Sequence, residues 1–520
     1  MENNYFKYFF SAFIVVIIIL TGYYIAKTSK IKADNQTMVK KEEQLSPIQN
    51  DLRLGVAELD TMNPIFSNNR NVYEYSKLFY SFLVRLDAGY NLKYDLVKDI
   101  TKLDDLNYEI IIRNDATWQN NSGKVTVKDV KFTIEQINNN KSLYNSNIEN
   151  IEAITVKDDY TMVLKLKKPQ AFFEYTLTFP IMKEVDSEFF KNKEQYPVPV
   201  TSGKYIYKES VNNTAIYEAN TNYYEKFEPS IKNIIVTHYN SMGELYNSFK
   251  SGNIDLITTN ETNIEQYIGK NGYQLVGIKD MNFTFLAINN ERNNNADVKR
   301  GISKMIAFDR ILEALYGNYI RSTYPLDYGS HLYKNIALNV GDIRKLDTSV
   351  PEAKALFQKS NFKGPIKILT NQDNEMQNII ATEISKQLNE NGISVIIEKV
   401  GKDNYYNRIN EKNYDYAIVT LKTSMTPNLD RFLGEGNILN YNNEEVRKLL
   451  NEAKQEKLNE NTKTKLEEIY NNVENIYLND MPFIGIVRNT KSVILNTGVT
   501  TDGNLNIFDM FQNIEKWYRR

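Results

Sequence analysis

Between residues 366 and 420, three strand-like segments alternate with two helical patterns, and this alternation restricts the fold class more than any other feature. The strand-like segments are residues 366–369, 393–400 and 416–420. The first helical pattern repeats apolar residues from Met376 to Leu388 and stops at Gly392, where glycine can take the left-handed backbone that ends many helices. A second pattern covers residues 405–410. Strands joined through helices pair in parallel, so the series predicts a parallel sheet covered by helices.

The size and charge of the chain indicate a folded protein of two or three lobes. Its 520 residues are 42% apolar and 25% charged, which is typical of globular proteins. The net charge of −2 comes from 63 basic and 65 acidic residues that are well mixed along the chain. Because no basic stripe stands out, nucleic acid is not expected as a partner.

The residue types that carry most enzyme and metal chemistry are scarce. Cysteine is absent, which excludes disulfides, thiolate metal sites, a cysteine nucleophile and a lipid-modified N-terminal cysteine. His238 and His331 are the only histidines, and their positions show no catalytic or metal-binding pattern. We therefore expect a protein that is not an enzyme and needs no cofactor or metal.

Residues 8–26 form a charge-free apolar segment long enough to approach the thickness of a bilayer core. Aromatic residues flank both ends, as at membrane interfaces. Because the apolar run is longer than a usual signal-peptide core, an N-terminal transmembrane anchor is favoured over a cleaved signal peptide that would end near Ala33. The lysines that follow the segment, taken alone, favour a cytoplasmic C-terminal side. Residues 1–33 are therefore interpreted as an anchor or signal-anchor and 34–49 as a flexible linker.

A strand, a turn and a helix are predicted in succession between residues 109 and 137. The β-branched segment 109–113 suits a half-buried strand, and 120–123 has the composition of a turn. Thr126 can cap a helix, and Asp129 lies in its first turn. Trp118 lies between the strand and the turn.

Further strands and helices are predicted in the same way. The predicted strands are residues 51–57, 154–166 (a hairpin), 231–238, 281–289 and 482–487. The predicted helices are residues 72–86, 297–307, 351–357, 444–457 and 462–477.

Five segments, taken in order, resemble one protein family over nearly all of residues 50–520. In chain order they are Asn63-Pro64, the segment 78–84, the stretch 108–134 (the strand 108–113, Trp118 and the segment 123–134), the turn 199–205 and the helix 298–310. Each is weakly specific alone, but their order is similar to that in the extracellular solute-binding proteins of peptide, dipeptide and nickel ABC importers (solute-binding family 5).

The resemblance implies a fold and a function. The expected fold is α/β, two-lobed and periplasmic-binding-protein-like (type II, cluster C), with an extra small domain in the first lobe and one N-terminal transmembrane helix before it. The implied domains are residues 50–288 (first lobe with inserted domain), 289–484 (second lobe) and 485–520 (return to the first lobe). Two strands, 283–290 and 482–489, would cross between the lobes.

The expected function is substrate binding for an ABC importer. A peptide or peptide-like solute would bind between the lobes, which close as a hinge and deliver it to a membrane permease. The expected protein is a monomer, held in the cell membrane by its N-terminal helix. The binding domain is expected on the extracellular face, because the family resemblance overrides the orientation that the lysines alone favour. The alternative is a membrane-tethered sensor or accessory protein on the same fold with a degenerate ligand cleft.

The candidate ligand-binding residues are family positions. They are Glu58, Asn63, Thr201, Ser202, Gly203, Leu421, Lys422, Thr423, Ser424, Asp430 and Arg431. Peptide-binding members carry a tryptophan near Leu421 and, near Thr423, an aspartate that binds the peptide α-amine; both are missing here. Asp430, a few residues on, could replace that aspartate, and a helix-capping or surface aspartate is an equal alternative. We expect Lys422 to meet a ligand carboxylate instead, while the turn 201–203 has a purely structural alternative.

Overall fold

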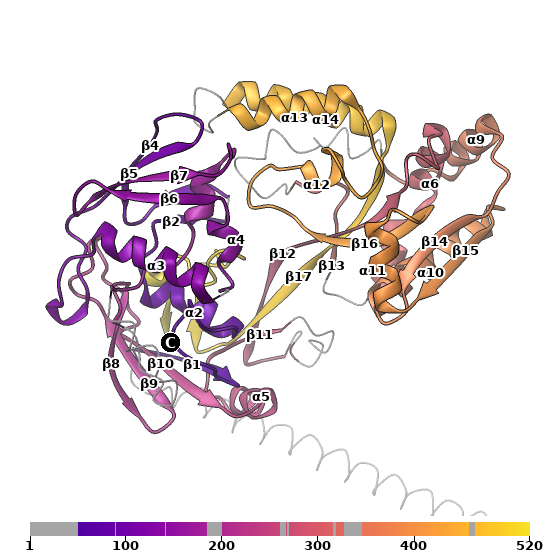
Figure 1. Ribbon diagram of the computed structural model, residues 1–520. Coiled ribbons are helices and arrows are strands. Elements are labelled where there is room, and N and C mark those ends of the chain that lie inside the picture. The colour runs from indigo at the N-terminus through magenta and orange to yellow at the C-terminus, as the bar shows by residue number, and fades with distance from the viewer. Residues whose placement is uncertain are drawn as a thin grey trace, which may run out of the picture. The chain divides into compact units, whose positions relative to one another are not determined.

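The structure of the protein is a computed structural model (Figure 1). It describes residues 50–88, 90–140, 142–184, 200–259, 267, 270–315, 319–326, 346–456 and 463–519. Residues Asp51–Tyr518 form one compact unit. The predicted anchor, the linker 34–49 and His331 lie outside the described residues. Across the described part of the chain, no helix is long and apolar enough to cross a membrane.

The first sheet is built from the N-terminal strand and three strands that lie more than 150 residues later. Its order is β1 (Asp51–Ala57), β10 (Asn233–Tyr239), β9 (Thr214–Ala219) and β8 (Tyr205–Val211), with β1 parallel to β10. The helices α2 (Arg70–Phe79) and α5 (Met242–Lys250) contact β1. The sheet and α2 share an apolar core with the C-terminal segment, including Trp517.

Helix α2 is shorter than the predicted helix 72–86, and that prediction is wrong at its C-terminal end. The helix ends at Phe79, Tyr80 is extended, and β2 (Val84–Leu86) pairs with β3 (Leu92–Tyr94). The physical reason is tertiary: the Asp95 carboxylate accepts a hydrogen bond from the Phe82 amide at 2.9 Å, which satisfies an extended backbone there.

A second, antiparallel sheet has its own core. Its order is β4 (Val97–Lys102), β5 (Asn107–Ile112), β7 (Thr161–Leu166) and β6 (Ile151–Val156). The short helical elements around it are η1 (Gln119–Asn121), α3 (Val127–Asn140), α4 (Asn145–Ile148) and η2 (Phe173–Leu177). One face of α3 contributes Val127, Val130, Ile134 and Ile137 to this core, as its spacing predicts.

The start of α3 uses a different cap from the predicted one. The Asp129 carboxylate accepts the Thr126 backbone N–H at 2.8 Å and the Trp118 indole N–H at 3.4 Å. The Thr126 hydroxyl donates to the same carboxylate instead of accepting from the helix. Burial raises the pKa of Asp129, and these donors partly offset that effect.

The third sheet has seven strands and confirms the predicted parallel series. Its path is β11 (Leu256–Thr259), β17 (Phe483–Asn496), β12 (Tyr273–Ile288), β16 (Tyr416–Lys422), β14 (Ile366–Asn371) and β15 (Val395–Val400), with β13 (Tyr319–Arg321) on β17. β14 pairs in parallel with β15 and β16, whereas β12 and β16 are antiparallel.

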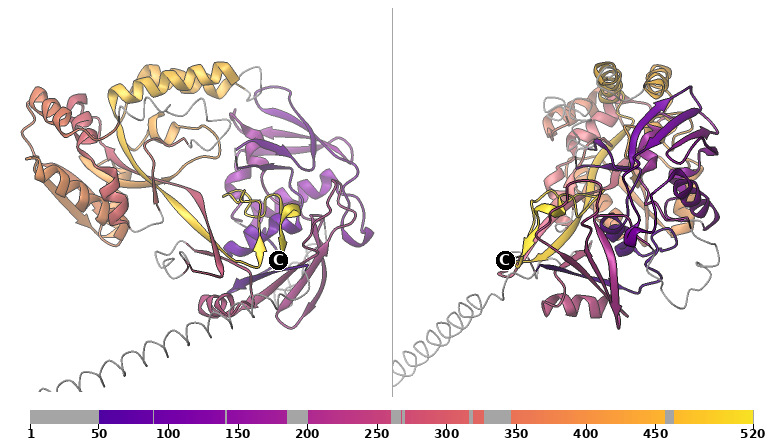
Figure 2. Two further views of the ribbon diagram at one scale, coloured as in Figure 1. Left: turned by 180° about the vertical axis from the view of Figure 1, so that it is seen from behind. Right: turned by 90° about the vertical axis from the view of Figure 1, so that its left-hand side faces the viewer.

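The helices of this region are α6 (Ala296–Met305), α7 (Phe308–Ala314), α9 (Val350–Ser360), α10 (Glu375–Glu390), α11 (Lys402–Asn410), α12 (Asp430–Leu433), α13 (Glu444–Gln455) and α14 (Lys463–Asp480). Figure 2 shows α13 and α14 lying together along one edge. The chain ends with β18 (Val499–Thr500), η6 (Ile514–Lys516) and β19 (Tyr518–Arg519).

Strands β12 and β17 join two of the apolar cores. They pair antiparallel from Tyr273 opposite Asn496 to Ala287 opposite Phe483. One end of the pair contributes to the core of the first sheet and the other to the large core of the parallel region. Figure 1 shows both as long strands running through the molecule. The cores are therefore linked by a thin, hydrogen-bonded ribbon.

Candidate functional site

Two adjoining cavities, of about 970 and 650 Å³, lie where segments of the two linked regions face each other. We call them together the cleft. One side, the α2–α4 wall, contains Arg70 and Tyr73 with residues 143–149. The other, the β16–α12 wall, consists of residues 422–432. The cavities share residues from both walls, among them Glu149 and Asp430, so they adjoin each other. Its size suits an extended ligand.

The β16–α12 wall begins where β16 leaves the sheet. Lys422 is the last β16 residue opposite β12. The Thr423 amide and hydroxyl both donate to the Met281 carbonyl oxygen, at 2.8 and 2.9 Å, which turns the chain toward the cleft. Asn428 then accepts the Asp430 amide at 2.8 Å and starts α12. Asp430 forms an ion pair with Lys454 at 2.8 Å.

Behind this wall lies Arg488 of β17, whose side chain is buried. Its guanidinium donates to the Pro325 carbonyl at 2.8 Å, to the Thr423 hydroxyl at 3.1 Å and to the Asp280 carbonyl at 3.3 Å. All three acceptors are uncharged, and no carboxylate of the described residues lies within 4.0 Å of it. Arg488 is not among the site residues predicted from the sequence, where its signal is a charged residue directly after the apolar strand 482–487.

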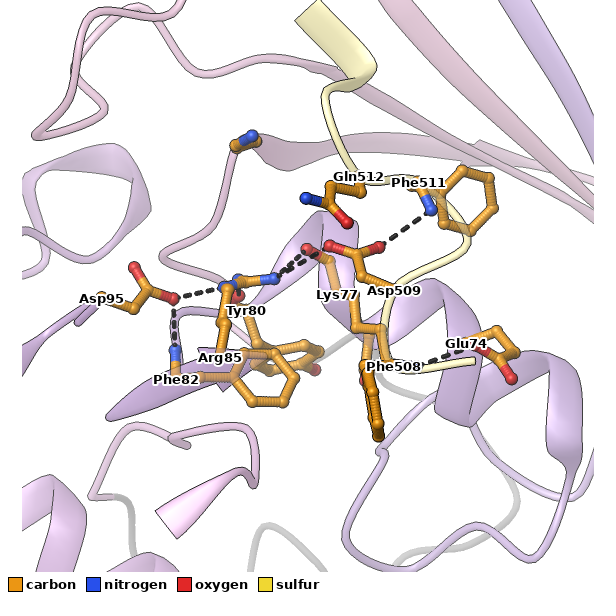
Figure 3. A network of polar contacts seen from close by, with 12 residues as sticks. Glu74, Lys77, Tyr80, Phe82, Arg85, Asp95, Phe508, Asp509, Phe511 and Gln512 are labelled. Carbon is orange, nitrogen blue, oxygen red and sulfur yellow. Dashed lines mark hydrogen bonds and ion pairs between the residues drawn. The ribbon is translucent and has the colours of Figure 1, made fainter. Parts of the chain in front are cut away.

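The α2–α4 wall rests on a buried carboxylate surrounded by cations. Glu74 forms ion pairs with Arg70 at 3.0 Å, with Lys77 at 2.8 Å and with Lys491 at 3.6 Å. Figure 3 shows Glu74 and Lys77. Burial alone would raise the pKa of Glu74, but the three cations outweigh it and lower the pKa to about 2. Lys77 Nζ also lies 4.3 Å from the centroid of the Tyr73 ring, which lines the cleft.

A second ion-pair group fixes the C-terminal segment against the same wall. The Arg85 guanidinium contacts Asp95 at 2.6 Å and Asp509 at 3.8 Å (Figure 3). Asp509 also accepts the Phe511 amide at 2.8 Å. This holds Phe508 in the cleft lining, where its ring meets Tyr90 edge-on with centroids 4.6 Å apart. Neither group was singled out from the sequence, because the partners are far apart along the chain.

The structure brings five of the predicted site residues together on one wall. They are Lys422, Thr423, Ser424, Asp430 and Arg431. Lys422 and Arg431 are exposed, and Arg431 donates to the Lys422 carbonyl at 3.4 Å. Neither cation has a carboxylate partner among the described residues. Their contact with a ligand stays a prediction.

The other predicted site residues do not line the cleft. Leu421 lies within β16, opposite Phe283. Glu58 is exposed, and its amide donates to the Tyr239 carbonyl at 2.9 Å. Asn63 is buried in a turn in which its side chain accepts the Ile65 amide at 3.0 Å.

The turn 201–203 packs inside the fold. Thr201 contacts Gln119, and Ser81 donates to the Ser202 carbonyl at 2.9 Å. Gly203 lies so close to the end of α2 that an added Cβ would fall 2.5 Å from the Phe79 carbonyl carbon. These contacts support the structural interpretation of the turn, and its part in binding stays a prediction.

The chemistry of the cleft is that of binding by charge, hydrogen bonds and aromatic contact. His238 lies at the end of β10, where its Nε2 accepts the Leu59 amide at 3.4 Å. Among the residues that the structure describes, no group of three or more histidine, aspartate or glutamate side chains could hold a metal ion.

Two cores joined by a strand ribbon, with a cleft between their facing walls, define a two-lobed binding protein of mixed α/β type. Residues 91–440 match the family described as "Bacterial extracellular solute-binding proteins, family 5 Middle". The match covers well over half of the chain, so the chain belongs to family 5 of the bacterial extracellular solute-binding proteins. The resemblance noted in the sequence is thereby confirmed.

Individual relatives agree with this assignment. The chain is 22% identical over 550 residues to the oligopeptide-binding protein AppA of Bacillus subtilis (strain 168), covering 96% of this chain and 97% of that protein. It shares the fold of the unliganded open form of the periplasmic murein tripeptide-binding protein MppA, with a TM-score of 0.78, 17% identity and coverage of 91% and 97%. For AppA of Bacillus subtilis in complex with a nonapeptide, the TM-score is 0.56, with 20% identity and coverage of 91% and 100%.

Proposed function

We propose that the protein is the substrate-binding component of an ABC importer and captures peptides or peptide-like solutes in the cleft. The observation that carries this proposal is the cleft of two adjoining cavities between walls that belong to differently folded regions of a family 5 protein. Relatives named for oligopeptide and murein tripeptide binding support a peptide ligand. The cavities of about 970 and 650 Å³ are large enough for several residues of an extended peptide.

The proposal includes hinge closure. Strands β12 and β17 link the cores, so a small change in their twist can move one wall toward the other without repacking either core. The parts that would move are the predicted domains: the first lobe, formed by residues 50–288 and 485–520, and the second lobe, formed by residues 289–484. A membrane permease would then distinguish the closed, ligand-bound protein from the open one.

The proposal also includes the location of the protein. The family is extracellular, and the charge-free segment 8–26 would hold the chain in the cell membrane with the cleft outside, without a lipid-modified cysteine. The residues 34–49 would serve as a linker, and the protein would act as a monomer.

The test is native mass spectrometry of residues 45–520 purified without denaturation. Co-purified peptide, thermal stabilisation by peptide mixtures and a smaller radius in X-ray scattering on binding are the expected results. The alternative, a membrane-tethered sensor or accessory protein with a degenerate cleft, predicts no bound peptide. It also predicts no stabilisation by a broad peptide mixture and an unchanged radius.

A further inference from the structure

Three cations at one end of the cleft have no carboxylate partner among the described residues. Arg488 lies buried behind the wall, and Lys422 and Arg431 lie exposed on it. Bare positive charge is costly to bury and is usually compensated by an anion or by a strong set of acceptors. Arg488 has only uncharged acceptors.

Two carboxylates of the cleft lining, Asp430 and Asp280, have other partners within the protein. Asp430 forms its ion pair with Lys454 at 2.8 Å. Asp280 accepts the Met281 amide at 2.6 Å and the Asn282 side-chain amide at 2.8 Å. Neither is among the ion-pair partners of the three cations in the described structure.

The facing wall supplies little negative charge at this end. Arg70 of α2 is itself a cation, bound to Glu74 at 3.0 Å. Glu149 is the carboxylate of the facing wall, and in the larger cavity it lies with Lys167 and Lys168. Around Thr423 itself, Lys422, Arg431 and the buried Arg488 outnumber the carboxylates Asp280 and Asp430, so this wall presents an excess of positive charge to its occupant.

Thr423 lies between the buried Arg488 and the surface of the cleft. Its hydroxyl donates to the Met281 carbonyl and accepts from Arg488, so its orientation is fixed and its dipole is polarised by the guanidinium. A ligand ammonium placed there would meet Lys422 and Arg431, with Arg488 behind them, against the single carboxylate of Asp280, which forms no ion pair among the described residues. A ligand carboxylate would meet two exposed donors and the field of a third.

We propose that this end of the cleft binds the acidic group of the ligand, either the α-carboxylate of a peptide or an acidic side chain, and does not require a free α-amine. The assignment rests on the proposed function. It names Lys422 and Arg431 as the residues that contact the ligand carboxylate and Arg488 as the residue that orients Thr423 and biases the charge of the wall.

The experiment uses residues 45–520 and mixtures of synthetic peptides of one length, built from uncharged residues only. Four mixtures differ at their ends: both free, N-acetylated, C-amidated, and blocked at both ends. Binding is measured by titration calorimetry and thermal shift. We expect N-acetylation to change affinity by less than about threefold and C-amidation to weaken it at least tenfold. Adding one glutamate to the doubly blocked mixture should restore binding if an acidic side chain is the group recognised.

A matched pair of double variants locates the effect. K422Q/R431Q should weaken binding of the free-acid mixture at least tenfold and leave binding of the amidated mixture within about twofold. The control K399Q/K448Q removes two exposed lysines that lie outside the cleft lining and should change neither.

The outcomes separate the two proposals. Binding of the mixtures that depends on a free amine, or that ignores the charge of the carboxyl end, overturns this assignment and leaves the proposed function standing. Absence of binding by every mixture, including the glutamate-containing one, overturns both.

Discussion

The cations at and behind the two walls of the cleft differ in whether they have carboxylate partners. On the α2–α4 wall, Arg70, Lys77 and Lys491 surround Glu74, and a neighbouring arginine contacts two aspartates. On the β16–α12 wall, the three cations Lys422, Arg431 and Arg488 have no carboxylate partner among the described residues.

This difference in pairing separates charged residues that stabilise the fold, which we call the framework, from charged residues that are available to a ligand. Paired, buried charges fix α2 and the C-terminal segment. Removing one partner leaves the remaining buried charges without compensation. Unpaired cations at a cleft contribute little to the stability of the fold and leave their charge available to a ligand. Pairing and burial therefore give a way to sort charged residues that residue type alone does not provide.

Replacing Glu74 by glutamine should have the largest effect on stability. It would leave three cations around a neutral amide, and breaking a buried ion pair in this way typically costs about 3–5 kcal/mol. Urea unfolding followed by circular dichroism measures the loss. The control is E149Q, which removes an exposed carboxylate of the cleft and should stay within about 0.5 kcal/mol. Equal losses in the two variants would contradict the framework role of the network.

The same carboxylate should produce an acid dependence. Its pKa is lowered from 4.5 to about 2, because the cations outweigh the effect of burial. A group with a depressed folded pKa stabilises the protein fully above its unfolded pKa and loses that contribution as pH falls through the folded value. The stability difference between the native chain and E74Q should therefore be constant above pH 4.5 and shrink by about 3 kcal/mol toward pH 2. A difference independent of pH in this range would count against the ion pairs.

Replacing Arg488 by methionine should cost less than E74Q. The change removes a buried charge without a carboxylate partner, which offsets part of the loss of its hydrogen bonds to the Pro325 and Asp280 carbonyls and to Thr423. We expect a net change within about 2 kcal/mol, measured by the same urea titration. A loss as large as that of E74Q would show that Arg488 belongs to the framework.

The exposed cations should matter least for stability. K422Q and R431Q, alone or together, should change the free energy of unfolding by no more than about 0.5 kcal/mol, because both side chains are exposed and unpaired. Any ligand affinity that depends on them should fall with added salt, since the Debye length shortens from about 10 Å at 0.1 M to about 3 Å at 1 M. Salt-independent binding that is still lost in the double variant would point to packing instead of charge.

The sequence by itself determined the family, the parallel series at β14, β15 and β16, and the strand, turn and helix around Trp118. These features depend on local periodicity and on short motifs, which neighbouring residues encode. Local signals also explain one failure: the apolar spacing of 72–86 continues past Phe79, but contacts with Asp95 convert its end into an extended segment.

Only the tertiary structure decided which charged residues are framework and which face the cleft. Lys491 forms an ion pair with Glu74, which lies hundreds of residues earlier in the chain. Arg488 donates a hydrogen bond to Thr423, which lies tens of residues earlier. These contacts between distant residues depend on the pairing and register of β12, β16 and β17, which no single segment specifies. The sequence placed Lys422, Thr423 and Arg431 together, but their excess of positive charge emerges only when Arg488 is folded behind them.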